Sequence, residues 1–172
     1  MGPRNSVEGR IYSFRSEAEC AGLGVVFPDI PSIVLCHRVL VLDWIPQRKG
    51  YVKVMTITSK LRPDGEYLPI SPTKKKPFPI QLRLQNGPES IVHNMRIINI
   101  TALRLFSYLK IDSYYEVPLR ILREEKDRFG CQLMLCPKHL GSIRHLRSYL
   151  KDHEKCQMQR NDEDVVSDGK EF

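Results

Sequence analysis

Two neighbouring runs of aliphatic and β-branched residues constrain the fold of this chain more than any other feature. Residues 38–44 (RVLVLDW) form a nearly continuous apolar run, and residues 51–58 (YVKVMTIT) alternate between apolar and polar side chains. The first pattern is typical of a strand buried on both faces, and the second of a strand with one buried face. Pro46 and Gly50 bound the segment between them and favour a turn. We therefore expect an antiparallel hairpin at the heart of a curved sheet.

The remaining strand signals are short and are separated by turns. Similar apolar patterns predict further strands at 10–14, 79–84, 95–100, 108–114 and 129–135. A helix is predicted only after Pro137, where Leu140, Ile143, Leu146 and Leu150 recur at helical spacing opposite a basic face. The chain is thus predicted to be mainly β, with one C-terminal helix packed on the sheet through this apolar stripe.

The other segments are predicted to lie outside the sheet. Five prolines fall between residues 61 and 79, and because proline donates no backbone N–H, the segment 60–79 is predicted to be an exposed loop insertion. Residues 1–8 are predicted to be a flexible N-terminus. Residues 157–172 are acidic and offer no usable apolar face, which favours a disordered tail. One domain is therefore expected over residues 9–156.

The net charge and the number of cysteines indicate which binding partners and which cellular compartments are favoured. The chain of 172 residues has 27 Lys and Arg against 20 Asp and Glu, a net charge of +7 that favours polyanionic partners. Five cysteines, an odd number, argue against a secreted disulfide scaffold. No apolar run is long enough to span a bilayer. We expect a cytoplasmic or nuclear protein without a membrane partner.

The order of four short segments resembles a known family. Residues 9–12 (GRIY), 37–42 (HRVLVL), 54–59 (VMTITS) and 107–122, followed by a strand and an amphipathic helix, are similar in order to the MazF/PemK-like (Kid) toxins, and closest to the PemK-like proteins of fungi. The resemblance implies an SH3-like, partly open PemK-type barrel with a C-terminal helix. The long loop rich in proline and lysine and the disordered acidic tail would be additions to it.

The resemblance also implies a function. Active members of the family cut single-stranded RNA without a metal or other cofactor, so it implies a metal-independent endoribonuclease, or a descendant that still binds RNA. Family members form homodimers and have protein antitoxins as partners. The alternative is a non-catalytic SH3-like barrel that binds protein or nucleic acid, since one fold serves many functions.

Site residues follow from the resemblance position by position. Asp112 matches the carboxylate that would act as general base, Lys110 a cation two residues before it, and Arg38 an arginine that holds or protonates the substrate. Thr58 and Ser59 match hydroxyl groups that bind substrate. The basic triplet of the loop would add phosphate contacts through Lys74, Lys75 and Lys76. The chain departs from the family at Val39, which replaces a proline, and at Lys110, which replaces an arginine.

Each of these residues has a purely structural interpretation as well. Lys110 and Asp112 could form a solvated ion pair, Arg38 could pair with Asp43 or Glu66, and Thr58 and Ser59 could make turn hydrogen bonds. His37, beside Arg38, is interpreted as a structural or surface residue.

Cysteine and histidine residues are frequent in the C-terminal third, but their spacing only approaches that of a zinc site, so no metal site is predicted. We expect free thiols there, packed as small hydrophobic side chains. The residues concerned are Cys131, Cys136, His139, His145, His153 and Cys156.

Overall fold

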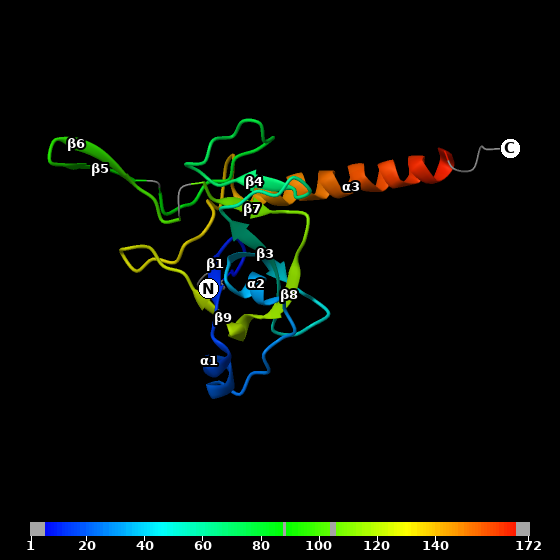
Figure 1. Cartoon of the computed structure of the whole chain (residues 1–172), viewed down its shortest axis with the longest axis horizontal. Helices are drawn as coiled ribbons and strands as arrows, with labels where there is room; N and C mark the ends of the chain where they lie inside the picture. Colours follow the sequence, from blue (N-terminus) through cyan, green and yellow to red (C-terminus); the bar gives the residue numbers. More distant parts are fainter. Residues whose placement is uncertain (1–5, 88, 104–105, 168–172) are drawn as a thin grey trace.

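A computed structural model describes residues 6–87, 89–103 and 106–167 of the chain (Figure 1). Its main element is an antiparallel sheet of seven strands, in the order β4-β7-β3-β2-β1-β9, with β8 also paired to β3. Among the described residues the end strands β4 and β9 pair with no further strand of this sheet, so it is not closed into a barrel. The strands are β1 (Ile11–Phe14), β2 (Arg38–Trp44), β3 (Tyr51–Thr58), β4 (Tyr67–Pro69), β7 (Tyr108–Lys110), β8 (Tyr115–Pro118) and β9 (Leu122–Glu124).

The hairpin of β2 and β3 is confirmed, with both strands at the predicted residues. Arg38 is opposite Ile57 and Leu40 is opposite Met55, with a register shift between Val41 and Asp43. Because side chains alternate along a strand, Leu40 and Val41 point to opposite faces. Each of them is buried in a separate core cluster. The sheet is therefore covered on both faces, as the apolar run of β2 predicts.

The C-terminal helix α3 (Ile143–Ser167) packs on the sheet through part of the predicted stripe. Ile143 and Leu146 are buried in the first core cluster, and Leu150 packs against it. Leu140 lies before the helix and is 76% exposed. Arg147 fastens the helix to the N-terminal half of the chain by donating to the carbonyl oxygen of Leu42 at 2.8 Å.

Both chain ends differ from the prediction. Helix α3 continues to Ser167 and extends away from the sheet (Figure 1), where a disordered tail from residue 157 was expected. Residues 168–172 lie outside the described part. At the other end, Val7 is buried in the second core cluster and Glu8 forms an ion pair with Arg147 at 2.9 Å. Packing and pairing thus fix two residues of the expected flexible segment 1–8, while residues 1–5 lie outside the described part.

The segment 60–79 is also more ordered than its prolines indicate. It contains β4, which pairs antiparallel with β7, and Leu68 in this strand is fully buried. Proline is tolerated in an edge strand because one side of such a strand donates no ladder hydrogen bond, and Pro69 lies in this edge strand. The expected exposed loop is therefore interrupted by a core strand.

Two other predicted strands are reduced to isolated bridges. Leu82 bridges to Ile70, and Leu84 bridges to Leu135, so 79–84 and 129–135 line the core without forming strands. A second sheet consists of β5 (Glu89–His93) and β6 (Arg96–Ile100), a hairpin that projects from the body (Figure 1).

Three short helical segments were not predicted: α1 (Glu17–Gly22), α2 (Ser32–Leu35) and the 3₁₀ turn Leu119–Ile121. Helix α1 begins with a capping box in which Glu19 N donates to Ser16 Oγ at 3.1 Å. Within the described residues, no helix is both long enough and apolar enough to cross a bilayer.

Candidate functional site

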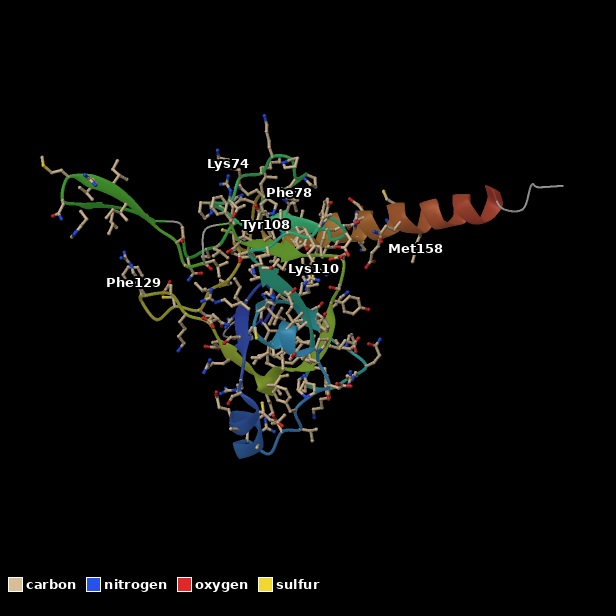
Figure 2. All side chains as sticks on the ribbon, in the orientation of Figure 1. Lys74, Phe78, Tyr108, Lys110, Phe129 and Met158 are labelled. Atoms are coloured by element: carbon tan, nitrogen blue, oxygen red, sulfur yellow. The ribbon has the colours of Figure 1, made fainter. Side chains whose placement is uncertain are left out.

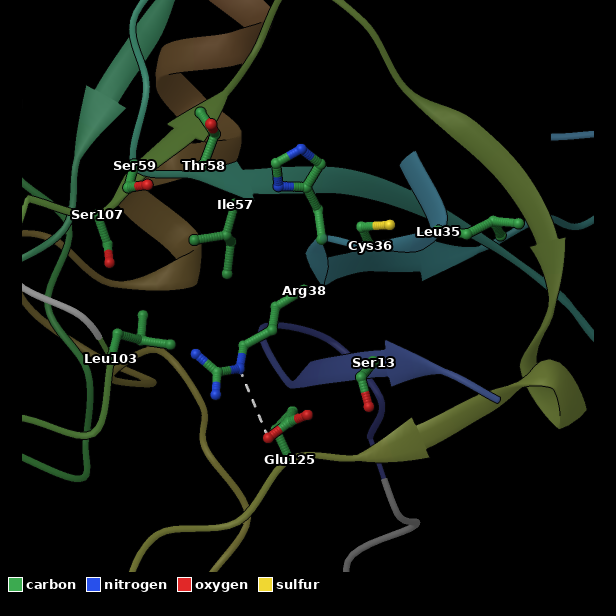
Figure 3. A pocket seen from close by; sticks show the side chains of 11 residues that line it. Ser13, Leu35, Cys36, Arg38, Ile57, Thr58, Ser59, Leu103, Ser107 and Glu125 are labelled. Carbon is green, nitrogen blue, oxygen red and sulfur yellow. Dashed lines mark ion pairs between the residues drawn. The ribbon is translucent and has the colours of Figure 1, made fainter. Parts of the chain in front are cut away.

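A pocket of about 420 Å³ opens where β2 begins and β3 ends. The register of the hairpin creates this position, because Arg38 at the start of β2 lies opposite Ile57 near the end of β3. Figure 3 shows side chains from β1, β2, β3 and the segment after β9 around the pocket. Its polar lining consists of Ser13, His37, Arg38, Thr58, Ser59, Ser107 and Glu125.

Arg38 and Glu125 form an ion pair inside this pocket. The Nε atom of Arg38 lies 3.5 Å from Oε2 of Glu125, and the two side chains are 40% and 24% exposed (Figure 3). Glu125 directly follows β9, and β1 separates β9 from β2 in the sheet. The sheet order therefore brings an acidic residue from late in the chain to an arginine from its first quarter.

The hydroxyl groups predicted to bind substrate also lie here. Thr58 and Ser59 line the pocket at the end of β3, as do Ser13 and Ser107. Thr58 already makes turn hydrogen bonds, since its Oγ1 accepts from Lys60 N at 3.2 Å and donates to Lys60 O at 3.3 Å. Thr58 therefore has a structural role at the strand end in addition to its position in the pocket.

Lys110 and Asp112 form a pair of their own outside the pocket lining. Lys110 Nζ lies 3.5 Å from Asp112 Oδ1, and the two side chains are 31% and 27% exposed. Tyr108 is opposite Thr58 in the sheet, so Lys110, two residues further along β7, points to the same face as Thr58 but does not line the pocket. Of the predicted site residues, Arg38, Thr58 and Ser59 share the pocket. Lys110 and Asp112 pair with each other instead, and Lys110 Nζ also lies 3.5 Å from Ser113 Oγ.

The basic triplet contributes to a different cavity. Lys75 lines a pocket of about 330 Å³ together with Arg83 and His145. Lys74 and Lys76 are exposed and line neither this cavity nor the Arg38 pocket. The phosphate contacts predicted for the triplet are therefore separated from Arg38.

Sequence reasoning assigned Arg38, Thr58 and Ser59 to the site but left out four other polar residues of the pocket, which are Ser13, His37, Ser107 and Glu125. His37 lines the pocket, and its position next to Arg38 was a usable signal. Glu125 had no local signal, because its contact with Arg38 depends on strand pairing between distant parts of the chain. The structural alternative paired Arg38 with Asp43 or Glu66, but these side chains pair with Arg147 and His153.

Asp127 lies in another surface region and has a structural role. Its carboxylate accepts hydrogen bonds from Asn86, from Phe129 N and from Cys131 N. These bonds, that from Asn86 above all, hold the pKa of Asp127 below its usual range. They fix the turn 127–131.

The cysteine and histidine residues described in the C-terminal third do not come together as a metal site. Cys131, Cys136 and Cys156 are free thiols, but Cys131 and Cys156 are exposed rather than packed as small hydrophobic side chains. His145 Nδ1 accepts from Gly141 N, and His153 pairs with Glu66. Throughout the described residues, no group of three or more His, Cys, Asp or Glu side chains could hold a metal ion.

The Arg38 pocket thus combines a cation, a carboxylate, an imidazole and several hydroxyl groups. A guanidinium can bind phosphate oxygens, while a carboxylate and an imidazole can accept and donate protons. No protein-family model, curated protein or solved structure matches this chain. Its function is therefore inferred from this geometry and from the order of its sequence segments.

Proposed function

We propose that the protein is a metal-independent endoribonuclease of the MazF/PemK type that cuts single-stranded RNA, with an open sheet of SH3-like, PemK-type descent. The observation that carries the proposal is the convergence of Arg38, His37 and Glu125 with four hydroxyl groups on one pocket. The family resemblance assigns Arg38, Thr58 and Ser59 to an RNA-cleaving site. Their meeting in one cavity supports that assignment.

The chemistry needs no cofactor. Glu125 takes the proton from a ribose 2′-hydroxyl, whose oxygen forms a bond to the adjacent phosphorus as the bond from phosphorus to the 5′ oxygen breaks. His37 donates a proton to that leaving oxygen. Arg38 stabilises the negative charge that grows on the phosphoryl oxygens. The products are a 2′,3′-cyclic phosphate and a free 5′-hydroxyl.

The proposal assigns the carboxylate differently from the family resemblance. Asp112 is paired with Lys110 at 3.5 Å and does not line the pocket, whereas Glu125 is paired with Arg38 inside it. We assign the base to Glu125 because a general base must reach the group whose proton it removes. Lys110 and Asp112 then remain a surface pair, which typically contributes little to stability.

A second candidate is an RNA-binding descendant or a non-catalytic binding module. It is favoured by the Arg38–Glu125 ion pair itself, because a guanidinium that already has a carboxylate partner attracts phosphate less strongly. In that case the pocket would still bind its ligand, but its side chains would not carry out the proton transfers of the cleavage reaction.

The partners of the proposed enzyme are single-stranded RNA, a second copy of the chain and a protein antitoxin, and its location is the cytoplasm or the nucleus. A homodimer is the commonest symmetric assembly. Light scattering at high micromolar concentration is expected to give twice the mass of the chain. A monomeric mass would remove the dimer from the proposal.

The test of the function is a digest of single-stranded RNA in excess chelator, followed by mapping of the new 3′ ends. Cleavage that leaves cyclic phosphates is the expected result. Salt-sensitive RNA binding without cleavage would support the binding descendant instead. Absence of both cleavage and binding would leave a module that binds protein.

A further inference from the structure

The second pocket lies between the segment 75–83 and the start of α3. Its volume is about 330 Å³, and the residues that matter for its chemistry are Lys75, Gln81, Arg83, Gly141 and His145. It shares no lining residue with the Arg38 pocket. Any ligand that it binds is therefore held by a separate set of side chains.

Lys75 and Arg83 give this pocket positive charge, beside an apolar wall formed by Pro79, Ile80 and Leu140. None of its lining residues is an Asp or a Glu. The ion pairs found among the described residues include neither Lys75 nor Arg83. In the first pocket, by contrast, Glu125 neutralises Arg38. The second pocket therefore carries two cations that no acid of its own lining neutralises.

Hydrogen bonds at the base of the loop hold the segment that carries Lys75 in place. Thr73 is only 4% exposed, and its Oγ1 donates to the carbonyl oxygen of Ser107 at 3.2 Å. Phe78 N donates to Lys75 O at 2.6 Å, and the Phe78 ring lies against Tyr108 (Figure 2). Ser107 also lines the Arg38 pocket, so this hydrogen bond links the walls of the two pockets.

Gly141 fixes the opposite wall. Its φ is +77°, and a Cβ at this position would lie 2.5 Å from the carbonyl oxygen of Gln81. The close approach lets Arg83 N donate to Gly141 O at 3.0 Å. Gly141 N in turn donates to His145 Nδ1 at 3.0 Å. Since Nδ1 accepts, the proton of the neutral ring is on Nε2, and His145 adds an N–H donor to the two cations.

We propose that this pocket binds a backbone phosphate of the RNA strand whose cleavage is assigned to the Arg38 pocket, an inference that rests on the proposed function. The planar fork of Arg83 can bind two oxygens of one phosphate, and Lys75 adds a point charge. A phosphate carries the oxygen acceptors that these donors require. The pocket would position the strand without taking part in the chemistry.

The test measures RNA binding without cleavage. A single-stranded RNA carrying 2′-O-methyl groups throughout lacks the attacking hydroxyl, so its affinity for the full chain can be measured as salt concentration is varied. The double variant K75Q/R83Q removes both cations of the pocket. The control K49Q/K155Q removes the same charge from two exposed lysines that line neither pocket.

The pocket variant is expected to bind about tenfold more weakly or worse than the wild type. Its slope of log affinity against log salt is expected to fall by about 0.7 for each lost phosphate contact. The control is expected to retain both the affinity and the slope. Equal losses in the two variants, or no loss in either, would overturn the inference, as would a wild type that does not bind this RNA.

Two further measurements separate this inference from the proposed function. If the wild type binds the 2′-O-methyl RNA but leaves unmodified RNA intact, the endoribonuclease fails, while a selective loss in K75Q/R83Q still supports the phosphate pocket. Competition by inorganic phosphate or adenosine monophosphate tests for a small ligand. Displacement of the RNA by either at micromolar concentration would assign the pocket to a free phosphate compound and contradict the RNA contact.

Discussion

The Nε atom of Arg38 lies 3.5 Å from the Oε2 atom of Glu125, although the two residues are far apart in the amino-acid sequence. Strand β1 pairs with both β2 and β9, and this shared neighbour sets their separation. The ion pair turns the guanidinium toward the pocket that also holds the hydroxyl groups of Thr58 and Ser59. The proposed chemistry depends on this arrangement.

Replacing Arg38 with alanine is expected to lower the rate of RNA cleavage by about 10²–10³-fold, the effect of removing one preorganised donor to a growing negative charge. The variant R48A is a matched control, because Arg48 is an exposed arginine paired with Glu116 at 3.2 Å away from the pocket. Single-turnover cleavage rates of the two variants are the measurement. Equal rates in both would show that Arg38 does not contact the reacting phosphate.

Two leucines of the predicted stripe are expected to differ in their effect on stability. Leu146 is fully buried, so Leu146→Ala should lower the free energy of unfolding by about 2–5 kcal/mol. Leu140 is 76% exposed, so Leu140→Ala should change it by less than about 0.5 kcal/mol. Urea unfolding of both variants measures the difference. A similar cost for both would mean that α3 is not packed on the sheet through Leu146.

Tyr149 is expected to make α3 sensitive to alkaline pH. Burial, and secondarily the charge of Glu66, raise the pKa of Tyr149. A raised pKa means that the folded protein holds this proton more tightly than the unfolded chain. The stability that this difference in pKa gives the folded protein is therefore fully present below the unfolded-state pKa of about 10. It is lost as the pH rises through the pKa of Tyr149 in the folded protein.

Thermal unfolding from pH 8 to pH 11 tests this dependence. The wild type is expected to lose more stability than Tyr149→Phe over that range. Tyr114→Phe, which changes a tyrosine that is 52% exposed, should behave like the wild type. A parallel loss in all three proteins would show that Tyr149 does not titrate differently in the folded state.

Local patterns predicted those parts of the fold that depend on neighbouring residues. The alternation in 51–58 and the apolar run in 38–44 identified β3 and β2 with the correct bounds. Strand β4 was missed because its proline argues against a strand, and Pro69 is tolerated because β4 is an end strand of the sheet. The extension of α3 past residue 157 has no apolar pattern to predict it.

In the candidate site, too, sequence patterns miss contacts between residues that are distant in the chain. The family resemblance groups Arg38, Thr58 and Ser59, and in the structure the start of β2 and the end of β3 lie side by side. Glu125 could not be grouped with them, because its place beside Arg38 arises from the pairing of β1 with β9 across most of the chain. Lys110 and Asp112 do lie close together, but β7 ends at Lys110, so Asp112 is not part of the strand on which their predicted spacing relied.

The most direct test of the account compares two carboxylates, Glu125→Gln and Asp112→Asn, in the RNA digest with excess chelator. Each variant must first show the thermal stability of the wild type. The account predicts that Glu125→Gln lowers cleavage by about 10²–10⁴-fold, the usual contribution of a general base, and that Asp112→Asn retains the wild-type rate. Loss of cleavage in Asp112→Asn with full activity in Glu125→Gln would contradict the account and place the site at Lys110 and Asp112.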